Sequence, residues 1–223
     1  MYGYVAYHTA EEPPYRVFGG VRFRAVYVAE GESLRARLSA RAAARRLARE
    51  GVRCAVFPAD YPYCEVFARY GVAPPPSAPL YRATAAAIVR RYLAQSGVEP
   101  RNAVVTFAAE RVTPELRRAV ETLCAEVRYI ALAIPQDGDA LARSLRRDFG
   151  VAARVGPLDA LPRADLVVAF GDAIAGNDAL HLDESLDVVY DSELRNELLA
   201  LLWRAGALEA DALQVINVTR NVA

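Results

Sequence analysis

The sequence predicts an α/β protein, in which a doubly wound and mostly parallel sheet follows a smaller N-terminal α/β domain that contains a β-hairpin. First, short apolar runs alternate with helical periods from residue 103 to the end, which is typical of strand–helix–strand units. Second, these runs are apolar at successive positions, as in strands buried on both faces. Third, residues 1–102 hold 15 arginines against 8 acidic residues, and residues 103–223 hold 12 against 19.

These observations divide the chain into three segments. Residues 1–78 form a basic N-terminal α/β domain, residues 79–102 a connecting helix and linker, and residues 103–223 an acidic domain. The basic part is also rich in tyrosine, since 10 of the 12 tyrosines lie in residues 1–102. Residues 73–79 contain four prolines and form the clearest linker, because proline keeps a chain stiff and extended.

In the acidic domain we expect six strands and three helices. The strands are residues 103–107, 128–134, 152–155, 166–170, 186–190 and 213–218. Thr113 supplies an N-cap and Pro114 the first helical position, so the first helix begins there. The second helix ends at Phe149, which its spacing places on the buried face. The third helix covers residues 192–205 and, like the others, connects two strands of the sheet.

With this layout, residues 103–223 resemble the Rossmann-like nucleotide-binding domains, on the strand count and on the run Ala164-Asp165-Leu166-Val167-Val168. The resemblance implies a glycine-rich turn before the first helix, which lets the backbone approach a pyrophosphate. Here that turn, residues 108–114, contains no glycine and places Glu110 where a phosphate would lie. Glu110 is either an exposed loop acid stabilised by the helix dipole or a built-in anion that replaces the phosphate. We therefore predict no cofactor and expect NAD and NADP to be disfavoured.

The resemblance also implies a ligand site outside the carboxyl ends of the strands. The candidate ligand-binding residues there are Glu110, Asp137, Gly171, Asp172 and Asp191. Clustered carboxylates can hold a divalent cation, but their spacing matches no known metal loop, and we predict no metal. No catalytic residue is assigned. His181, which stands between two leucines, is interpreted as structural.

In the basic domain, residues 33–50 predict a helix with a narrow apolar stripe, and Gly19-Gly20 predicts the hairpin turn. The stripe consists of Ala36, Ala40, Ala43, Ala44 and Leu47. The other side carries Arg35, Arg41, Arg45, Arg46 and Arg49. Cys64 falls in the first turn of a short helix, where the dipole lowers a thiol pKa. Residues 80–95 predict one further helix.

Composition excludes some chemistry and favours a compartment. The chain has no lysine, which excludes a Schiff-base enzyme and a Walker-type phosphate loop. Three cysteines, far apart and odd in number, suit the reducing cytoplasm. We see neither a signal peptide nor an apolar stretch long enough for a membrane span. Abundant alanine and arginine without lysine are typical of a GC-rich bacterial genome.

Three functions remain open at this point. A non-catalytic ligand-binding or interaction protein on a degenerate Rossmann-like domain fits the fold and the missing glycines best. A small-molecule metabolic enzyme with an interdomain site is the second. A nucleic-acid-binding module that uses the Arg/Tyr-rich half is the third, although no such motif accompanies it. The ligand would lie at the strand carboxyl ends, and opposed basic and acidic halves could form a homo-oligomer.

Overall fold

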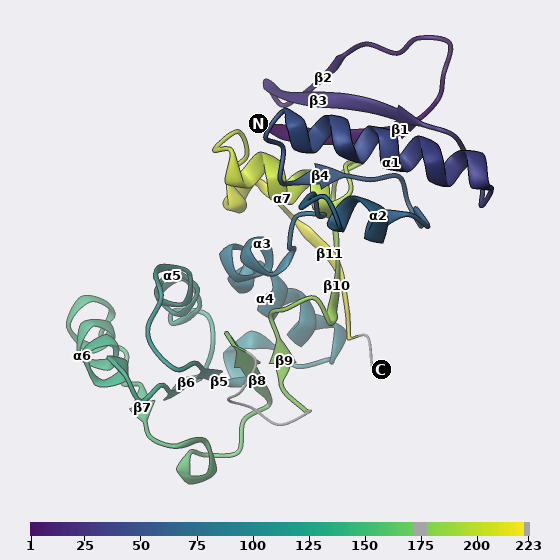
Figure 1. Cartoon of the computed structure of the whole chain (residues 1–223). Coiled ribbons are helices and arrows are strands. Elements are labelled where there is room, and N and C mark those ends of the chain that lie inside the picture. Colours follow the sequence, from purple (N-terminus) through teal and green to yellow (C-terminus); the bar gives the residue numbers. More distant parts are fainter. Residues whose placement is uncertain (172–177, 221–223) are drawn as a thin grey trace. The chain divides into compact units, whose positions relative to one another are not determined.

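The computed structural model describes residues 1–171 and 178–220, and the chain forms two compact units (Figure 1). The first unit consists of Met1–Pro76 together with Leu194–Glu209, and the second of Ser77–Glu193 together with Ala210–Ala223. Residues 79–102 thus fall within the second unit, and residues 194–209 within the first. The predicted fold class is confirmed, because the chain contains a five-stranded parallel sheet and a four-stranded mixed sheet.

The first unit is built on the mixed sheet. Its strands are β1 (Tyr2–Tyr7), β2 (Tyr15–Phe18), β3 (Val21–Val28) and β4 (Ala55–Val56), in the spatial order β2-β3-β1-β4. β1 runs parallel to both β3 and β4, and β2 runs antiparallel to β3. The predicted hairpin turn is confirmed: Gly19 and Gly20 have φ angles of 51° and 77°, a region that glycine adopts without strain.

Helix α1 (Leu34–Arg49) covers one face of this sheet. The Ser33 side chain accepts a hydrogen bond from the amide of Ala36 at 3.1 Å, which caps the helix. The five residues of the predicted stripe are all buried, and four of them, Ala40, Ala43, Ala44 and Leu47, belong to one core cluster with β-strand residues such as Val5 and Val26. Helix α2 (Cys64–Ala68) follows and buries Phe67 in the same core.

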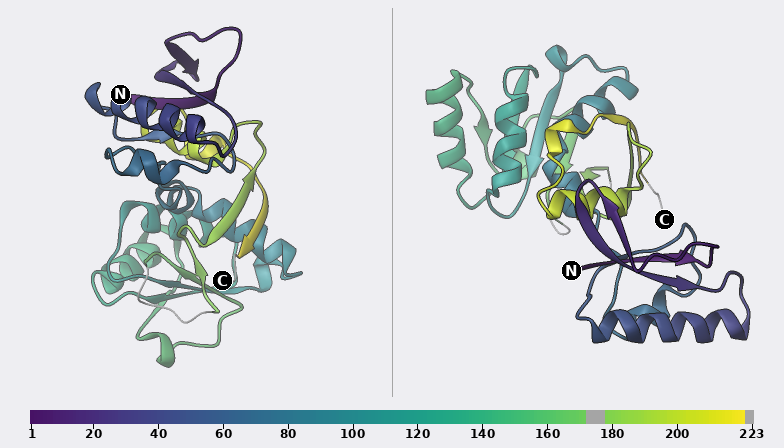
Figure 2. Two further views of the ribbon diagram at one scale, coloured as in Figure 1. Left: turned by 45° about the vertical axis from the view of Figure 1, so that its right-hand side comes forward. Right: turned by 90° about the horizontal axis from the view of Figure 1, so that it is seen from above.

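Helix α7 (Asn196–Arg204) covers the opposite face of the mixed sheet. Its leucines Leu198, Leu201 and Leu202 form a buried cluster with Phe23 and Val56. Figure 2 shows the strands of the first unit between α1 and the yellow α7. The sequence pattern predicts this helix correctly, but the helix does not join strands of the parallel sheet. Its apolar face packs instead on a sheet whose last strand ends 140 positions before the helix begins.

The second unit contains the parallel sheet. Its strands are β5 (Val104–Ala108), β6 (Tyr129–Ala133), β7 (Arg154–Val155), β8 (Leu166–Ala169) and β9 (Leu180–His181), in the order β7-β6-β5-β8-β9. The fifth strand differs from the prediction, which placed residues 186–190 there. β9 is only two residues long, too short to show any periodicity, and it includes His181.

Four helices accompany this sheet in the sequence of the second unit. They are α3 (Ala78–Ala83), α4 (Ala85–Gln95), α5 (Pro114–Leu123) and α6 (Gly138–Phe149), and short 3-10 turns lie at Pro100–Asn102, Leu158–Ala160 and Ala210–Ala212. The helix predicted over residues 80–95 is divided at Thr84, whose buried hydroxyl donates to the carbonyl of Leu80 at 2.9 Å. A hydrogen bond from a threonine hydroxyl to the carbonyl four residues earlier is known to bend helices. Phe149, expected on the buried face, is 48% exposed.

Strands β10 (Leu186–Tyr190) and β11 (Val215–Arg220) form an antiparallel ribbon rather than the last two strands of the parallel sheet. In β10 the residues Leu186, Val188 and Tyr190 are buried and the residues between them are exposed. This alternation belongs to a strand with one buried face. The ribbon is bonded to α4, because the Gln95 amide donates to Asn217 Oδ1 at 2.6 Å. In the described part of the chain, no helix combines the length and apolar character that a membrane span needs.

Candidate functional site

Glu110 and Asp137 follow the first two strands of the parallel sheet, as predicted. The loops that carry them are joined, because the amide of Gln136 donates to the carbonyl oxygen of Glu110 at 3.2 Å. Asp137 has a left-handed φ of 66° and directly precedes α6. Both side chains are exposed, and neither contacts a described residue through a hydrogen bond or ion pair. The structure thus brings the two loops together but leaves their carboxylates in solvent.

The start of α5 offers few amides to a phosphate. Pro114 at the first position has no N–H. The amide of Leu116 donates to Thr113 Oγ1 at 3.2 Å, as the predicted N-cap requires, and the amide of Arg117 donates to the Thr113 carbonyl at 2.9 Å. Helix N-termini bind phosphate through free amides, so this terminus has little left with which to hold one. The N-terminus of α6 is flanked by Asp137 and Asp139, which would repel an anion.

Of the other three predicted residues, Gly171 lies at the same edge of the parallel sheet as Glu110, because the amide of Phe170 donates to the carbonyl of Ala108 on β5 at 2.9 Å. Gly171 follows β8, next to Phe170. Asp172 lies outside the described residues. Asp191 follows β10, and its amide donates to the carbonyl of Gln214 at 2.8 Å, so it belongs to the ribbon and not to the edge of the parallel sheet. Within residues 1–171 and 178–220, no group of three or more His, Cys, Asp or Glu side chains could hold a metal ion.

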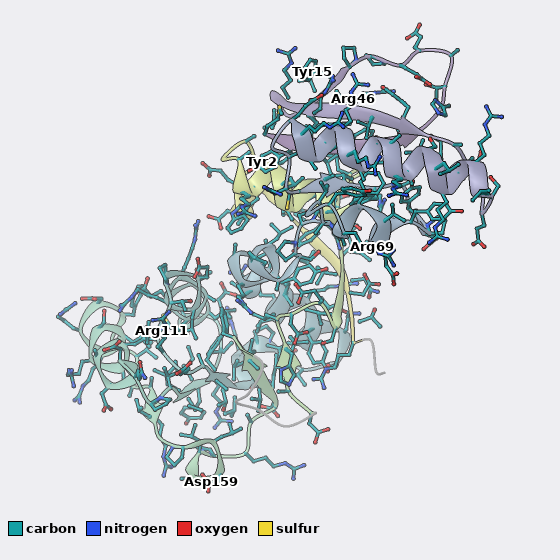
Figure 3. The ribbon with its side chains drawn as sticks, in the orientation of Figure 1. Tyr2, Tyr15, Arg46, Arg69, Arg111 and Asp159 are labelled. Carbon is teal, nitrogen blue, oxygen red and sulfur yellow. The ribbon has the colours of Figure 1, made fainter. Side chains whose placement is uncertain are left out.

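A groove between α1 and α2 has a different character. It encloses about 500 Å³ and lies entirely within the first unit; we refer to it as the α1–α2 groove. Its walls are formed by Leu34, Arg37, Leu38, Arg41, Val66, Arg69 and Tyr70. Figure 3 labels Arg69 beside α2. A second hollow of about 470 Å³ shares Leu34 and Arg37 and adds Glu32 to its walls.

Two arginines of this groove belong to a stripe along α1 that also includes Arg45. Arg37, Arg41 and Arg45 are spaced four residues apart on α1, so they share one face at intervals of roughly 6 Å along the helix axis. All three are exposed, as is Arg69, and none of the four makes an ion pair with a described residue. Like charges at this spacing destabilise a helix by about 0.2–0.5 kcal/mol per pair. A surface that keeps this repulsion uncompensated favours a ligand of opposite charge.

Tyr70 orients two of these arginines. The Nε atoms of Arg41 and Arg45 donate to its hydroxyl oxygen at 2.9 and 3.1 Å, and the Arg45 guanidinium lies 5.7 Å from the ring centroid. Hydrogen bonding from Arg41, reinforced by Arg45, lowers the pKa of the exposed Tyr70 hydroxyl below its usual range. Each guanidinium keeps its two terminal nitrogens for a ligand, since only Nε is engaged.

Two leucines stand exposed in the same groove. Leu34 is 74% and Leu38 is 56% exposed, and four residues separate them on α1, so they form an apolar stripe beside the arginines. Contiguous exposed apolar side chains rimmed by polar groups mark interaction sites. The predicted arginine face included neither Arg37 nor these leucines. The spacing of Arg37, Arg41 and Arg45 was the signal that could have identified the groove.

The position of Cys64 in the first turn of a helix leads us to expect a lowered thiol pKa, and the structure gives the opposite direction. Cys64 does begin α2, but burial raises the pKa of its thiol above the usual range. Its Sγ donates to the carbonyl oxygen of Tyr61 at 3.4 Å. His8, the one candidate base in that half of the chain, lies 2.6 Å from Glu12 through its Nδ1. A partly buried thiol whose pKa is raised holds less of the reactive thiolate.

No protein-family model matches the chain, and no curated protein matches it. Among solved structures it is similar to L-tryptophan dehydrogenase from Nostoc punctiforme, with 12% identity and a TM-score of 0.33, over 67% of this chain and 44% of that chain. It is also similar to a chorismate mutase/shikimate 5-dehydrogenase fusion protein from Clostridium acetobutylicum, with 11% identity and a TM-score of 0.26, over 75% and 66% of the two chains. Likeness this low identifies no family.

Proposed function

We propose that the protein is a non-catalytic interaction protein that binds an acidic polypeptide segment with apolar side chains in the α1–α2 groove. One observation carries the proposal: Leu34 and Leu38 stand exposed in the same groove as three arginines that have no carboxylate partner among the described residues. Arginine donates to carboxylates in a bidentate geometry, and the leucines would contact the apolar side chains of the same segment. An amphipathic segment that lies in a groove supplies both kinds of contact.

Two further features support this function. The α5 N-terminus, with Pro114 and a Thr113 cap that engages the Leu116 amide, argues against binding of NAD or NADP by the usual glycine-turn mode. All three cysteines are free thiols, which fits the reducing cytoplasm, the compartment that we propose. A nucleic acid would satisfy the arginines as well as a peptide would, but phosphates gain nothing from two exposed leucines.

Fluorescence anisotropy with labelled probes tests the proposal. The probes are a short amphipathic peptide of leucine and glutamate, the same peptide with lysine in place of glutamate, and an oligothymidylate. We expect the acidic peptide to bind in the micromolar range at low salt, the basic peptide not to bind, and the oligothymidylate to bind more weakly. Because exposed charges are screened over about 8–10 Å at physiological ionic strength, affinity should fall as salt rises.

Matched variants locate the site. The double variant Arg37→Glu with Arg41→Glu should weaken the acidic peptide at least about tenfold, which is 1.4 kcal/mol, and Leu38→Ser should weaken it as well. Arg35→Glu is the control, since Arg35 is exposed on the same helix but does not line the groove. Oligothymidylate binding that exceeds peptide binding and ignores Leu38→Ser would overturn the proposal in favour of nucleic acid. No binding of any probe at low salt would also overturn it.

A further inference from the structure

A second cavity, unrelated to the groove, lies within the second unit. It encloses about 560 Å³ between α4, α5 and the start of β11. Part of its wall is made of small apolar residues, among them Ala86, Ala87 and Ala119. Small-molecule sites are commonly concave, mostly apolar and of about 300–1,000 Å³, with a few polar groups that fix the ligand. The size of this cavity meets that description, and seven of its 14 lining residues are apolar.

Three arginines line the cavity, and two of them are neutralised. Arg90 donates from Nε and Nη2 to both carboxylate oxygens of Glu126, at 2.7 and 2.6 Å. Arg118 forms an ion pair with Asp211, which also lines the cavity. The positive charge of Arg90 and that of Arg118 are therefore each balanced by one carboxylate. The charge that remains is that of the third arginine.

That third arginine is Arg91. It forms no ion pair with a described residue, and its buried Nε has no hydrogen-bond partner in the described structure. Its two terminal nitrogens make no hydrogen bond with a described residue either, so they remain free to donate to an acceptor in the cavity. Thr122 and Gln214 also line the cavity, and their side chains make no hydrogen bond with a described residue. The cavity therefore offers one uncompensated guanidinium beside two neutral polar groups and an apolar wall.

We infer that this cavity binds a small organic molecule that carries one anionic group, a carboxylate or a phosphate, held by Arg91. A guanidinium donates two parallel hydrogen bonds to either group. Thr122 and Gln214 would bond to neutral polar atoms of the ligand, and the alanines would contact its apolar body. One anionic group matches the single uncompensated charge, whereas a second would meet the carboxylate of Asp211.

The test uses four probes on the whole chain: benzoate, phenyl phosphate, inorganic phosphate and the neutral benzamide. Binding is measured by calorimetry and by the shift of backbone amide resonances of Ala86 and Ala87. We expect benzoate, phenyl phosphate or both to bind and to shift those resonances, and benzamide not to bind. Comparison of the first two probes distinguishes a carboxylate ligand from a phosphate ligand.

Three variants make the result specific. Arg91→Gln should weaken the bound aromatic anion at least tenfold, and Ala87→Leu should weaken it by filling the cavity while leaving the charge in place. Arg143→Gln, an exposed arginine of α6 outside the cavity, should leave affinity unchanged. Circular dichroism confirms that each variant is folded. Equal affinity for Arg91→Gln and the parent chain, equal binding of benzamide, or inorganic phosphate that binds as tightly as phenyl phosphate regardless of Ala87→Leu (an adventitious ion only) would overturn the inference.

Discussion

The two units of the chain hold similar numbers of arginines but compensate them differently. The first unit has 13 arginines and 9 acidic residues, and the second has 14 and 18. In the α1–α2 groove one of the three arginines, Arg41, is bonded to a tyrosine hydroxyl, whereas in the cavity of the second unit two of three are bonded to carboxylates. The supply of nearby acids, more than the number of arginines, decides where positive charge remains available to a partner.

The difference in net charge between the two compact units is smaller than the difference between the two halves of the sequence. A boundary at residue 102 gives net charges of +7 and −7, but the units carry +4 and −4. The difference arises mainly because Arg82, Arg90, Arg91 and Arg101 lie in the second unit. Two of these arginines line the cavity. A homo-oligomer that forms through opposed basic and acidic surfaces stays a prediction. The difference in net charge that would drive its association is smaller than the sequence suggests.

We expect the largest effect on stability from a substitution in α7, which tests whether this helix belongs to the core of the first unit. Leu201 is fully buried in the cluster with Phe23, so Leu201→Ala should lower the free energy of unfolding of that unit by about 2–5 kcal/mol. Trp203, the one tryptophan, lies on α7 and reports the transition by fluorescence in urea. The control Leu34→Ala, at an exposed site, should change stability by less than about 0.5 kcal/mol. An equal effect of both substitutions would remove α7 from the core of the first unit.

Arg24 differs from the groove arginines of the first unit, because it is buried and paired with a carboxylate. Its Nη2 donates to Glu50 at 2.8 Å, and its Nη1 donates to the carbonyl of Pro14 at 2.9 Å. We expect Arg24→Met to cost about 2 kcal/mol, as for other hydrogen bonds between charged groups. Urea unfolding at neutral pH measures this cost. A cost near zero would mean that the pair does not fix the C-terminal end of α1 to β3.

The same pair predicts a pH dependence. Hydrogen bonding from Arg24 lowers the pKa of Glu50 below its usual 4.5. A carboxyl with a lowered folded pKa stabilises the protein above its unfolded pKa, and that contribution disappears as the pH falls through the folded pKa. Glu50→Gln should therefore destabilise the first unit at pH 7 and have a smaller effect at low pH. An effect that stays constant across this range would contradict the assignment.

Two glycines, one in each unit, allow a comparison of how tightly the neighbouring side chains pack around the backbone. A Cβ on Gly3 of β1 would lie 2.9 Å from Ala55 Cβ and 3.1 Å from side-chain atoms of Leu47 and Val52, whereas a Cβ on Gly138 of α6 would lie 3.3 Å from its nearest neighbours. Gly3→Ala should cost about 1–2 kcal/mol through overpacking, and Gly138→Ala should cost less. Thermal unfolding of both variants measures the order, and the reverse order would show that the strand of the first unit adjusts more easily.

The smallest effect concerns the ionisation of Tyr70. Because Arg41 and Arg45 donate to its hydroxyl, Tyr70 should titrate below its usual pKa, and Arg41→Gln should raise that pKa. Carbon-13 resonances of labelled tyrosine follow the titration, with Tyr70→Phe to assign the signal. Arg118→Gln in the second unit is the matched control and should leave it unchanged. If Arg41→Gln also has no effect, the tyrosine does not orient the arginine stripe.

Local patterns predicted the elements well. The hairpin turn at Gly19-Gly20, the alanine stripe of α1 and the cap at Thr113 are all confirmed. Each depends on residues within a few positions of one another, where backbone bonding and periodicity act directly. The same patterns could not say which sheet a helix or strand would join. The apolar periodicity of α7 predicts that one face of the helix is buried. It does not predict which sheet covers that face.

The candidate site was harder to predict for a related reason. The carboxyl-edge residues were chosen from the resemblance to Rossmann-like domains, which requires that every predicted strand belong to one sheet. β10 does not belong to the parallel sheet. Asp191, which follows β10, therefore lies in the antiparallel ribbon and not at the edge of the parallel sheet. Cys64 was placed correctly at the start of α2, yet the burial that raises its pKa comes from residues elsewhere in the fold. Charge compensation, which distinguishes the groove from the cavity, depends on contacts between residues far apart in the chain.

The late position of α7 bears on how the protein is made. A chain emerging from the ribosome presents β1 to β4 about 140 residues before α7 is synthesised. During that interval Phe23 and Val56 lack the leucines that bury them in the finished fold. The nascent first unit therefore exposes an apolar face while the parallel sheet is translated, and a chaperone that holds this face would be released only when residues 194–209 arrive.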